Sequence, residues 1–202
     1  MDIKKLLSTR GGDYAAACGL DFSKPPAFYD TFALRDAEGH EAMMQNWPYF
    51  RSKVSRRAMI YGEAVPVRSC WNGVVVMDAE SFYRGLNFRA IPDSLAKLHL
   101  EGSECCLIHA DNPGRVWMNP NVRVGYNEGA YRQVKGSSWM SIAWGLWTNR
   151  LRRWFSSAWF REVVIRRRVE KWEKDNPGSH EAGGFCLIDE MQVLIKNGWA
   201  HV

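Results

Sequence analysis

An unbroken apolar run near the middle of the chain dominates its hydrophobic pattern. Residues 65–79 read VPVRSCWNGVVVMDA, with a polar Asn-Gly turn, the valine-rich run 74–77 and then a carboxylate. A short apolar run without polar alternation predicts a strand buried on both faces, as in α/β sheets. Asp78 would then either emerge at the carboxyl end of the strand, where such sheets bind ligands, or cap a helix over 79–84.

Apolar segments separated by turn signals predict further strands and helices. We expect strands over 28–34, 88–91, 115–118 and 122–124, and helices over 47–61, 79–84 and near Ala130. Residues 13–20 fit either a strand or a buried turn of helix. Gly62 suits a helix end and Pro48 suits a first helical turn. The pattern therefore predicts a mixed α/β core over 13–135, preceded by a disordered leader over 1–12.

The period of the pattern changes at Trp139. Apolar residues then recur at three- and four-residue spacing while arginines occupy the other face, which predicts one long amphipathic helix over 139–174. Such a helix favours either docking of its apolar face on the chain's own domain or peripheral contact with an anionic membrane. We expect docking, with the arginines in water. The segment 136–202 would thus be a helical appendage.

Composition and charge narrow the class of protein. The chain of 202 residues has 10 tryptophans, which favours binding surfaces for sugars, bases, lipids or partners. Its net charge of +5 is concentrated in residues 150–174, and no nucleic-acid-binding motif accompanies it, so we expect no nucleic-acid partner. No run reaches the roughly 20 apolar residues of a membrane helix, and the start is too short and polar for a signal peptide, so we expect a soluble or cytoplasmic chain.

Motifs of common nucleophilic and nucleotide-binding sites do not occur. The chain lacks a GxSxG elbow, a P-loop, a GxGxxG turn and an HExxH pair. Its five cysteines form no CxxC pair, which argues against a zinc ribbon and allows one or two disulfides.

Carboxylates at the ends of apolar segments are more informative. If the strands are neighbours, several of these groups converge on one rim with His109, and they suit Mg²⁺ or Mn²⁺ bound together with substrate phosphates. Arg35 and Arg68 would neutralise a leaving diphosphate there. The carboxylates are Asp21, Asp36, Asp78, Glu101, Glu104 and Asp111.

Several stretches together resemble one family. They are residues 28–36 (FYDTFALRD), 47–52 (WPYFRS), 65–79, 88–89 (FR), 101–107 (EGSECCL), 119–126 (NPNVRVGY) and 189–192 (DEMQ). On these residues the chain resembles the fungal capsule-associated mannosyltransferases of glycosyltransferase family 69, which include the cryptococcal α-1,3-mannosyltransferase and the CAP59-like proteins. The resemblance runs from about Asp13 to the end. It matches the carboxyl-terminal half of longer members, so we expect their anchor, stem and nucleotide-binding half to be missing here.

The resemblance implies a GT-A-like α/β glycosyltransferase domain, here incomplete. It implies transfer of mannose from GDP-mannose, with Mn²⁺ or Mg²⁺, to a mannose-containing glycan acceptor in the Golgi or secretory pathway. The alternative is a non-catalytic remnant that binds glycans or a partner glycosyltransferase. By this resemblance we assign catalysis to Glu101 and Glu104, substrate binding to Trp71, Asn72 and Gly73, and metal binding to Asp21 and His109. From their positions at the ends of apolar segments we add Asp78 to the catalytic residues, Arg35 and Asp36 to the substrate-binding residues, and Asp111 to the metal ligands.

Overall fold

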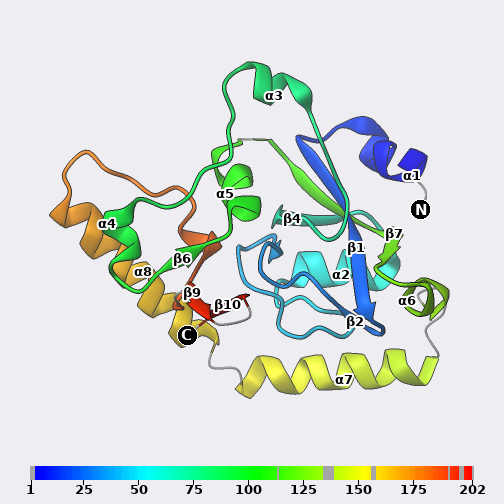
Figure 1. Ribbon diagram of the computed structural model, residues 1–202. Helices are drawn as coiled ribbons and strands as arrows, with labels where there is room; N and C mark the ends of the chain where they lie inside the picture. Colours follow the sequence, from blue (N-terminus) through cyan, green and yellow to red (C-terminus); the bar gives the residue numbers. More distant parts are fainter. Residues whose placement is uncertain are drawn as a thin grey trace.

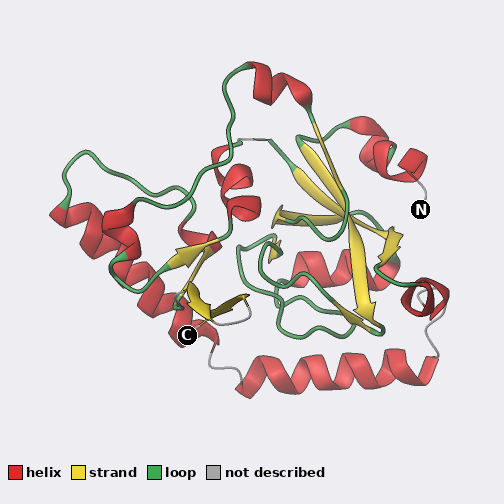
Figure 2. Cartoon of the chain, in the orientation of Figure 1, coloured by secondary structure: helices red, strands yellow, loops and turns green. Residues whose placement is uncertain are grey.

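The computed structural model describes residues 3–112, 114–133, 139–155, 158–190, 192–195 and 198–201, and confirms a mixed α/β fold (Figure 2). The main sheet has the strand order β2-β1-β7-β4-β3, with β5 paired to the first half of β1. Its strands are β1 (Ala16–Lys24), β2 (Ala27–Phe28), β3 (Arg35–Asp36), β4 (Val65–Ser69), β5 (Val75–Met77) and β7 (Val116–Gly125). Strands β1 and β7 run parallel, whereas the other pairs of this sheet are antiparallel.

Helices surround this sheet and form a second layer beside it. The helices are α1 (Ile3–Leu7), α2 (Lys53–Tyr61), α3 (Ala79–Tyr83), α4 (Asp93–Ala96), α5 (Glu104–Asp111), α6 (Glu128–Gln133), α7 (Trp139–Phe155) and α8 (Ala158–Asp175), with 3₁₀ turns η1 (Thr9–Gly12) and η2 (Gly184–Cys186). Two small sheets pair β6 (Glu101–Gly102) with β8 (Leu187–Ile188), and β9 (Gln192–Ile195) with β10 (Gly198–His201). Figure 1 shows α4, α8 and β6 on one side of the sheet and α7 along the lower edge of the molecule.

The core is built around β1 rather than around the valine-rich run. Seven consecutive residues from Ala16 are buried in β1, whereas β5 is only half-buried at the edge of the sheet. The run 74–77 is therefore not the doubly buried strand that its composition predicts. Two disulfides, within the number expected, tie this core together: Cys18–Cys70 joins β1 to the loop after β4, and Cys106–Cys186 joins α5 to η2.

Some local expectations are confirmed. Asp78 caps α3, because its Oδ1 accepts a hydrogen bond from the Glu80 amide at 3.0 Å. Gly62 ends α2 in the left-handed conformation at φ 67°. A short helix, α6, does contain Ala130, and residues 16–20 within the ambiguous segment 13–20 belong to a strand.

Other boundaries differ because tertiary contacts decide them. Residues 3–12, expected as a disordered leader, form α1 and η1 because Leu6 packs against Ala17 and Val122. The strand expected over 28–34 stops at Phe28, since Asp30 accepts hydrogen bonds from two following amides and turns the chain. The helix expected from residue 47 begins only at Lys53. No strand forms over 88–91. The two strands expected over 115–118 and 122–124 belong to the single strand β7, whose pairing with β1 shifts register between Met118 and Arg123.

The long helix expected over 139–174 is two helices, α7 and α8. Helix α8 docks as expected, burying Ile165, Val169 and Trp172 in a cluster with α4 and β8. Helix α7 instead leaves most of its large apolar side chains exposed. Among the described residues, no helix is long and apolar enough to cross a bilayer.

Candidate functional site

A polar cluster lies at the carboxyl ends of the parallel strands β1 and β7. Asp21 stands opposite Val124 in the register of this pair and has no exposed surface. Its carboxylate accepts hydrogen bonds from Asn72 Nδ2 at 2.9 Å, from the Tyr126 hydroxyl at 2.9 Å and from the Asp30 amide at 3.2 Å. In open α/β sheets this is the end at which ligands bind.

Asp30 places a second carboxylate beside the first. Its Oδ1 accepts hydrogen bonds from the amides of Phe32 and Ala33, and its Oδ2 accepts one from the Asn72 amide at 3.3 Å. Burial raises the pKa of Asp30, and the neighbouring charge of Asp21 raises it further. Two carboxylates are thus held close together in a partly desolvated setting, where a bound cation would be stabilising.

Asn72 donates hydrogen bonds to both carboxylates, while its own amide oxygen accepts none from the described residues. Its Nδ2 donates both to Asp21 and to the Asp30 carbonyl, the latter at 3.0 Å. Its Oδ1 is buried and accepts no hydrogen bond within the part of the chain that the structure describes. An orphaned buried oxygen costs free energy unless a ligand satisfies it. The cluster therefore has an oxygen acceptor to spare, which suits a hard cation or a hydrogen-bond donor of a ligand.

Gly73 makes this arrangement possible. Its φ of 78° lies in the left-handed region, and a Cβ there would sit only 2.8 Å from Asp21 Cβ and 3.2 Å from Val124 Cβ. Only glycine therefore lets the loop after β4 pass this close to β1. The predicted Asn-Gly element thus packs directly on Asp21, although its role in sugar binding stays a prediction.

Glu104 and Trp71 lie around this cluster. Glu104 is exposed in the first turn of α5. Burial, together with the smaller effects of the Glu104 and Asp30 charges, raises the pKa of Cys105 to about 11, so both carboxylates act on the same thiol. Trp71 is half-buried and packs edge-on against Phe88, with ring centroids 5.8 Å apart. Trp71 therefore adjoins the cluster through its chain neighbour Asn72, and Glu104 lies in α5 outside the hydrogen bonds of the cluster.

His109 and Glu101 occupy structural positions. His109 is buried, and its Nε2 donates to the Cys70 carbonyl at 2.9 Å, which places the ring proton on that nitrogen. Burial lowers the pKa of His109 to about 4, so the ring is neutral at physiological pH. Glu101 lies in β6, where it pairs with Ile188. The metal role of His109 and the catalytic role of Glu101 stay predictions.

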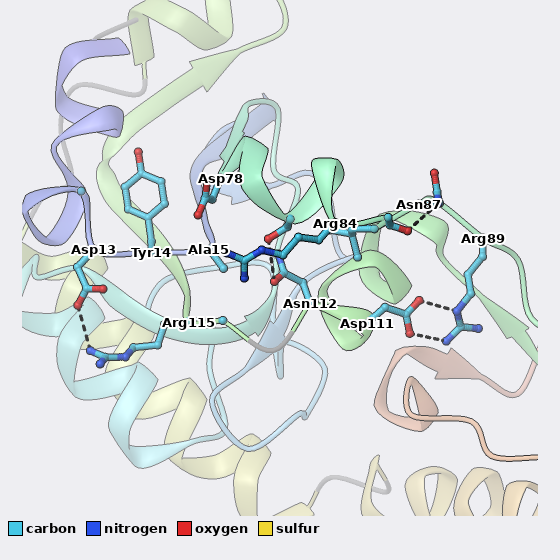
Figure 3. A pocket seen from close by; sticks show the side chains of 15 residues that line it. Asp13, Tyr14, Ala15, Asp78, Arg84, Asn87, Arg89, Asp111, Asn112 and Arg115 are labelled. Carbon is cyan, nitrogen blue, oxygen red and sulfur yellow. Dashed lines mark hydrogen bonds and ion pairs between the residues drawn. The ribbon is translucent and has the colours of Figure 1, made fainter.

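Asp78 and Asp111 lie at the other end of the sheet from Asp21. Because β5 runs antiparallel to β1, with Met77 opposite Ala16, the carboxyl end of β5 lies at the amino end of β1. Both carboxylates line a cavity of about 950 Å³ there (Figure 3), where Asp111 pairs with Arg89 at 2.6 Å. Within the described residues, no group of three or more His, Cys, Asp or Glu side chains is placed to hold a metal.

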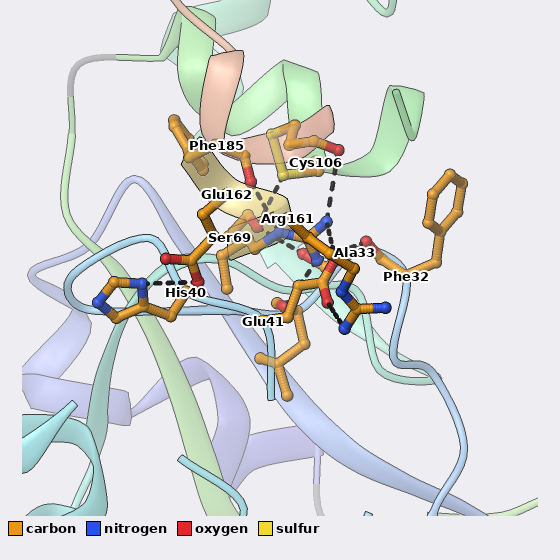
Figure 4. A network of polar contacts seen from close by, with 12 residues as sticks. Phe32, Ala33, His40, Glu41, Ser69, Cys106, Arg161, Glu162 and Phe185 are labelled. Carbon is orange, nitrogen blue, oxygen red and sulfur yellow. Dashed lines mark hydrogen bonds and ion pairs between the residues drawn. A yellow bond between two sulfur atoms is a disulfide. The ribbon is translucent and has the colours of Figure 1, made fainter. Parts of the chain in front are cut away.

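Arg35 and Asp36 hold the fold together. The Arg35 guanidinium is 1% exposed and donates to the carbonyls of Phe185 at 2.7 Å and Phe32 at 2.9 Å, two residues that Figure 4 shows in this network. The Asp36 carboxylate is fully buried and accepts from the Ser52 amide at 2.7 Å and from two further amides. These contacts satisfy both charged groups internally, and the substrate role predicted for them stays a prediction.

Sequence reasoning missed Asp30 and Tyr126 as site residues. Asp30 lies inside the strand expected over 28–34, and Tyr126 lies just after the strand expected over 122–124. Asp30 could have been found in the same way as Asp21, because it is a polar residue that follows apolar ones, here residues 27–29. Nothing local indicates that the Tyr126 hydroxyl reaches Asp21 across the sheet.

Comparison with known proteins supports the family resemblance. No curated protein matches the chain, and no solved structure matches it. The family model described as cryptococcal mannosyltransferase 1 matches residues 1–111, which is more than half of the 202 residues. The matched part contains Asp21, Asp30, Asn72 and Glu104, and so includes most of the cluster and its border. The chain therefore belongs to the cryptococcal mannosyltransferase 1 family.

Proposed function

We propose that the cluster at the carboxyl ends of β1 and β7 binds the diphosphate of GDP-mannose and transfers mannose to a mannose-containing glycan, forming an α-1,3 linkage. The observation that supports this most is the pair of carboxylates, Asp21 and Asp30, joined by Asn72 with one buried amide oxygen left without a partner among the described residues. Family membership supports the class of reaction, and the cluster is where we propose that it takes place.

A divalent cation, Mn²⁺ or Mg²⁺, fits this donor set. Carboxylate and amide oxygens are the ligands these ions take, and Mg²⁺ is commonly held by one or two carboxylates plus substrate phosphates. Asp21, Asp30 and Asn72 Oδ1 would hold the ion, and the phosphates of the donor would complete its coordination. When bound, the cation supplies positive charge for the leaving diphosphate.

In this proposal Glu104 and Trp71 act on the sugars. The acceptor hydroxyl oxygen would bond to the anomeric carbon on the face that the diphosphate leaves, which gives an α product from an α-linked donor. The hydroxyl proton would pass to the departing diphosphate, and the Glu104 carboxylate would stabilise the positive charge that develops on the sugar. Trp71 would offer an apolar ring face to a sugar.

The two disulfides support a secretory location for this activity. Bonds such as Cys18–Cys70 and Cys106–Cys186 persist in oxidising compartments and are rare in the cytosol. This agrees with glycan transfer in the Golgi rather than with the soluble, cytoplasmic chain expected from the sequence taken literally.

Two measurements on the purified chain test the proposal. The first is calorimetric binding of GDP with Mn²⁺ or with a chelator, and the second is mannose transfer from GDP-mannose to a mannobiose acceptor. We expect Asp21→Asn and Asp30→Asn to weaken metal-dependent GDP binding and to lower kcat/KM by about 100-fold or more.

Asp13→Asn is the matched control. Asp13 is exposed, pairs with Arg115 at 3.3 Å and lies at the amino end of β1, so binding and transfer should be unchanged. GDP binding that is absent, or that survives Asp21→Asn, would contradict the proposed donor site. Binding of a mannan fragment without any binding of GDP would favour a non-catalytic glycan-binding protein instead.

A further inference from the structure

Helix α7 contacts the rest of the protein through small and polar residues. Asn149 is 1% exposed, and its Nδ2 lies 3.5 Å from the Phe50 carbonyl oxygen and 3.6 Å from Met44 Sδ. Gly145 approaches more closely still, because a Cβ there would lie 2.3 Å from the Trp47 carbonyl oxygen. The inner face of α7 is therefore the face that holds Gly145 and Asn149.

Large apolar side chains occupy the opposite face of α7. At about 100° per residue they span an arc of about 100°, centred roughly opposite Asn149. Trp144 is 69%, Trp154 is 76% and Phe155 is 81% exposed. We call this set the aromatic stripe, and its members are Trp144, Trp147, Leu151, Trp154 and Phe155.

The stripe is too large and too continuous to be incidental. Single exposed apolar residues are ordinary on protein surfaces, but contiguous exposed apolar patches mark interaction sites. Trp159 and Phe160, at the start of α8, are also more than half exposed. Figure 1 shows α7 along the outer edge of the molecule, with the sheet and other helices on one side of it.

The charges beside the stripe indicate what it meets. Helix α7 contains no Asp or Glu, and its three arginines, Arg150, Arg152 and Arg153, are exposed. On the helical projection Arg150 and Arg152 flank the stripe on its two sides, each about 90–110° from its centre. Tryptophans with flanking arginines are typical of helices that lie in the interface of an anionic membrane.

We propose that α7 lies flat on an anionic lipid bilayer, with the aromatic stripe among the acyl chains and the flanking Arg150 and Arg152 on the lipid phosphates. The helix has 17 residues and is about 26 Å long, and it is too polar to span a bilayer. The inner face stays on the protein, since Gly145 and Asn149 point away from the stripe. This inference does not depend on the proposed transferase activity.

Flotation with vesicles tests the proposal. The full chain is mixed with phosphatidylcholine vesicles, with or without phosphatidylserine, and the blue shift of tryptophan fluorescence is followed in parallel. We expect wild-type protein to float with the anionic vesicles. The double variant Trp147→Ser/Trp154→Ser should bind at least about tenfold more weakly.

The arginines and the control are tested in the same assay. Arg150→Gln/Arg152→Gln should weaken binding to anionic vesicles by about thirtyfold. The control Tyr61→Ser/Tyr83→Ser removes two aromatic side chains that are 66% and 84% exposed on other elements, and should bind like wild type. Circular dichroism and urea midpoints check that each variant is folded.

Three results would overturn the proposal. They are no flotation of the wild-type chain, flotation that the stripe variant retains, and equal loss of binding in the tyrosine control. A wild-type dimer that the stripe variant converts to monomer, without lipid binding by either, would assign this face to a second copy and would also refute the membrane role.

Discussion

Replacing Gly73 by alanine tests how tightly the loop after β4 packs on the candidate site. The residue has a φ of 78°, where an L-residue loses about 1–2 kcal/mol. The new Cβ would also lie 2.8 Å from Asp21 Cβ and 3.2 Å from Val124 Cβ. Both neighbours belong to paired strands with little room to move, and overpacking of this kind costs about 1–3 kcal/mol. We therefore expect Gly73→Ala to lower the free energy of unfolding by about 2–5 kcal/mol.

Gly62→Ala is the matched control for this change. Gly62 has a φ of 67°, but nothing lies within 4 Å of a Cβ placed there. It should therefore lose only the backbone cost of about 1–2 kcal/mol, and the effect of the methyl group on the unfolded chain is the same in both variants. Urea unfolding followed by tryptophan fluorescence measures both. Equal losses would mean that Gly73 is not tightly packed against Asp21, and the reasoning would fail.

Three further predictions concern stability. His109 stays neutral in the folded protein with a pKa of about 4, whereas the unfolded chain takes up the proton below the ordinary pKa of 6.5. Stability is then full above pH 6.5 and falls by up to about 3 kcal/mol towards pH 4. In His109→Gln the free energy of unfolding should therefore depend less on pH between pH 7 and 5. If urea unfolding gives the same pH dependence for the variant and the wild type, the assignment of His109 as a neutral ring is wrong. The raised pKa of Asp30 changes stability with pH in the opposite direction. It does so equally in the wild type and in His109→Gln, so it cancels when the two are compared. Cys18→Ser/Cys70→Ser removes a disulfide that joins residues 52 apart in the sequence, and should lower the free energy of unfolding by about 4 kcal/mol. Urea midpoints of the variant and the oxidised wild type measure this loss. A loss below about 1 kcal/mol would refute the expected constraint on the unfolded chain. Asp78→Ala removes the cap of α3 and should cost about 1 kcal/mol, whereas Asp78→Asn should retain most of it.

The local sequence was sufficient to predict the structure where the interacting groups are neighbours along the chain. Asp78 caps α3 through an amide two residues away, and Gly62 ends α2 through its own backbone conformation. The mixed α/β class follows from the alternation of segments, and the family follows from motifs that need no coordinates. The Asn-Gly turn at residues 72–73 was also evident from residue type alone.

The candidate site needed tertiary structure because strand direction is set by distant pairing. Asp78 and Asp21 both stand near carboxyl ends of apolar strands, yet the antiparallel pairing of β5 with β1 places them at opposite ends of the sheet. Asp30 and Tyr126 join Asp21 only through contacts made across the fold.

The orientation of α7 gives the same lesson for a helix. Its periodicity predicts an apolar face but does not state what that face meets. The fit of Gly145 against the Trp47 carbonyl, and the burial of Asn149, turn the apolar face outward. Residue spacing along the chain determines which side chains share a face, because that depends on local backbone geometry. Only the packing of distant segments determines which face is covered.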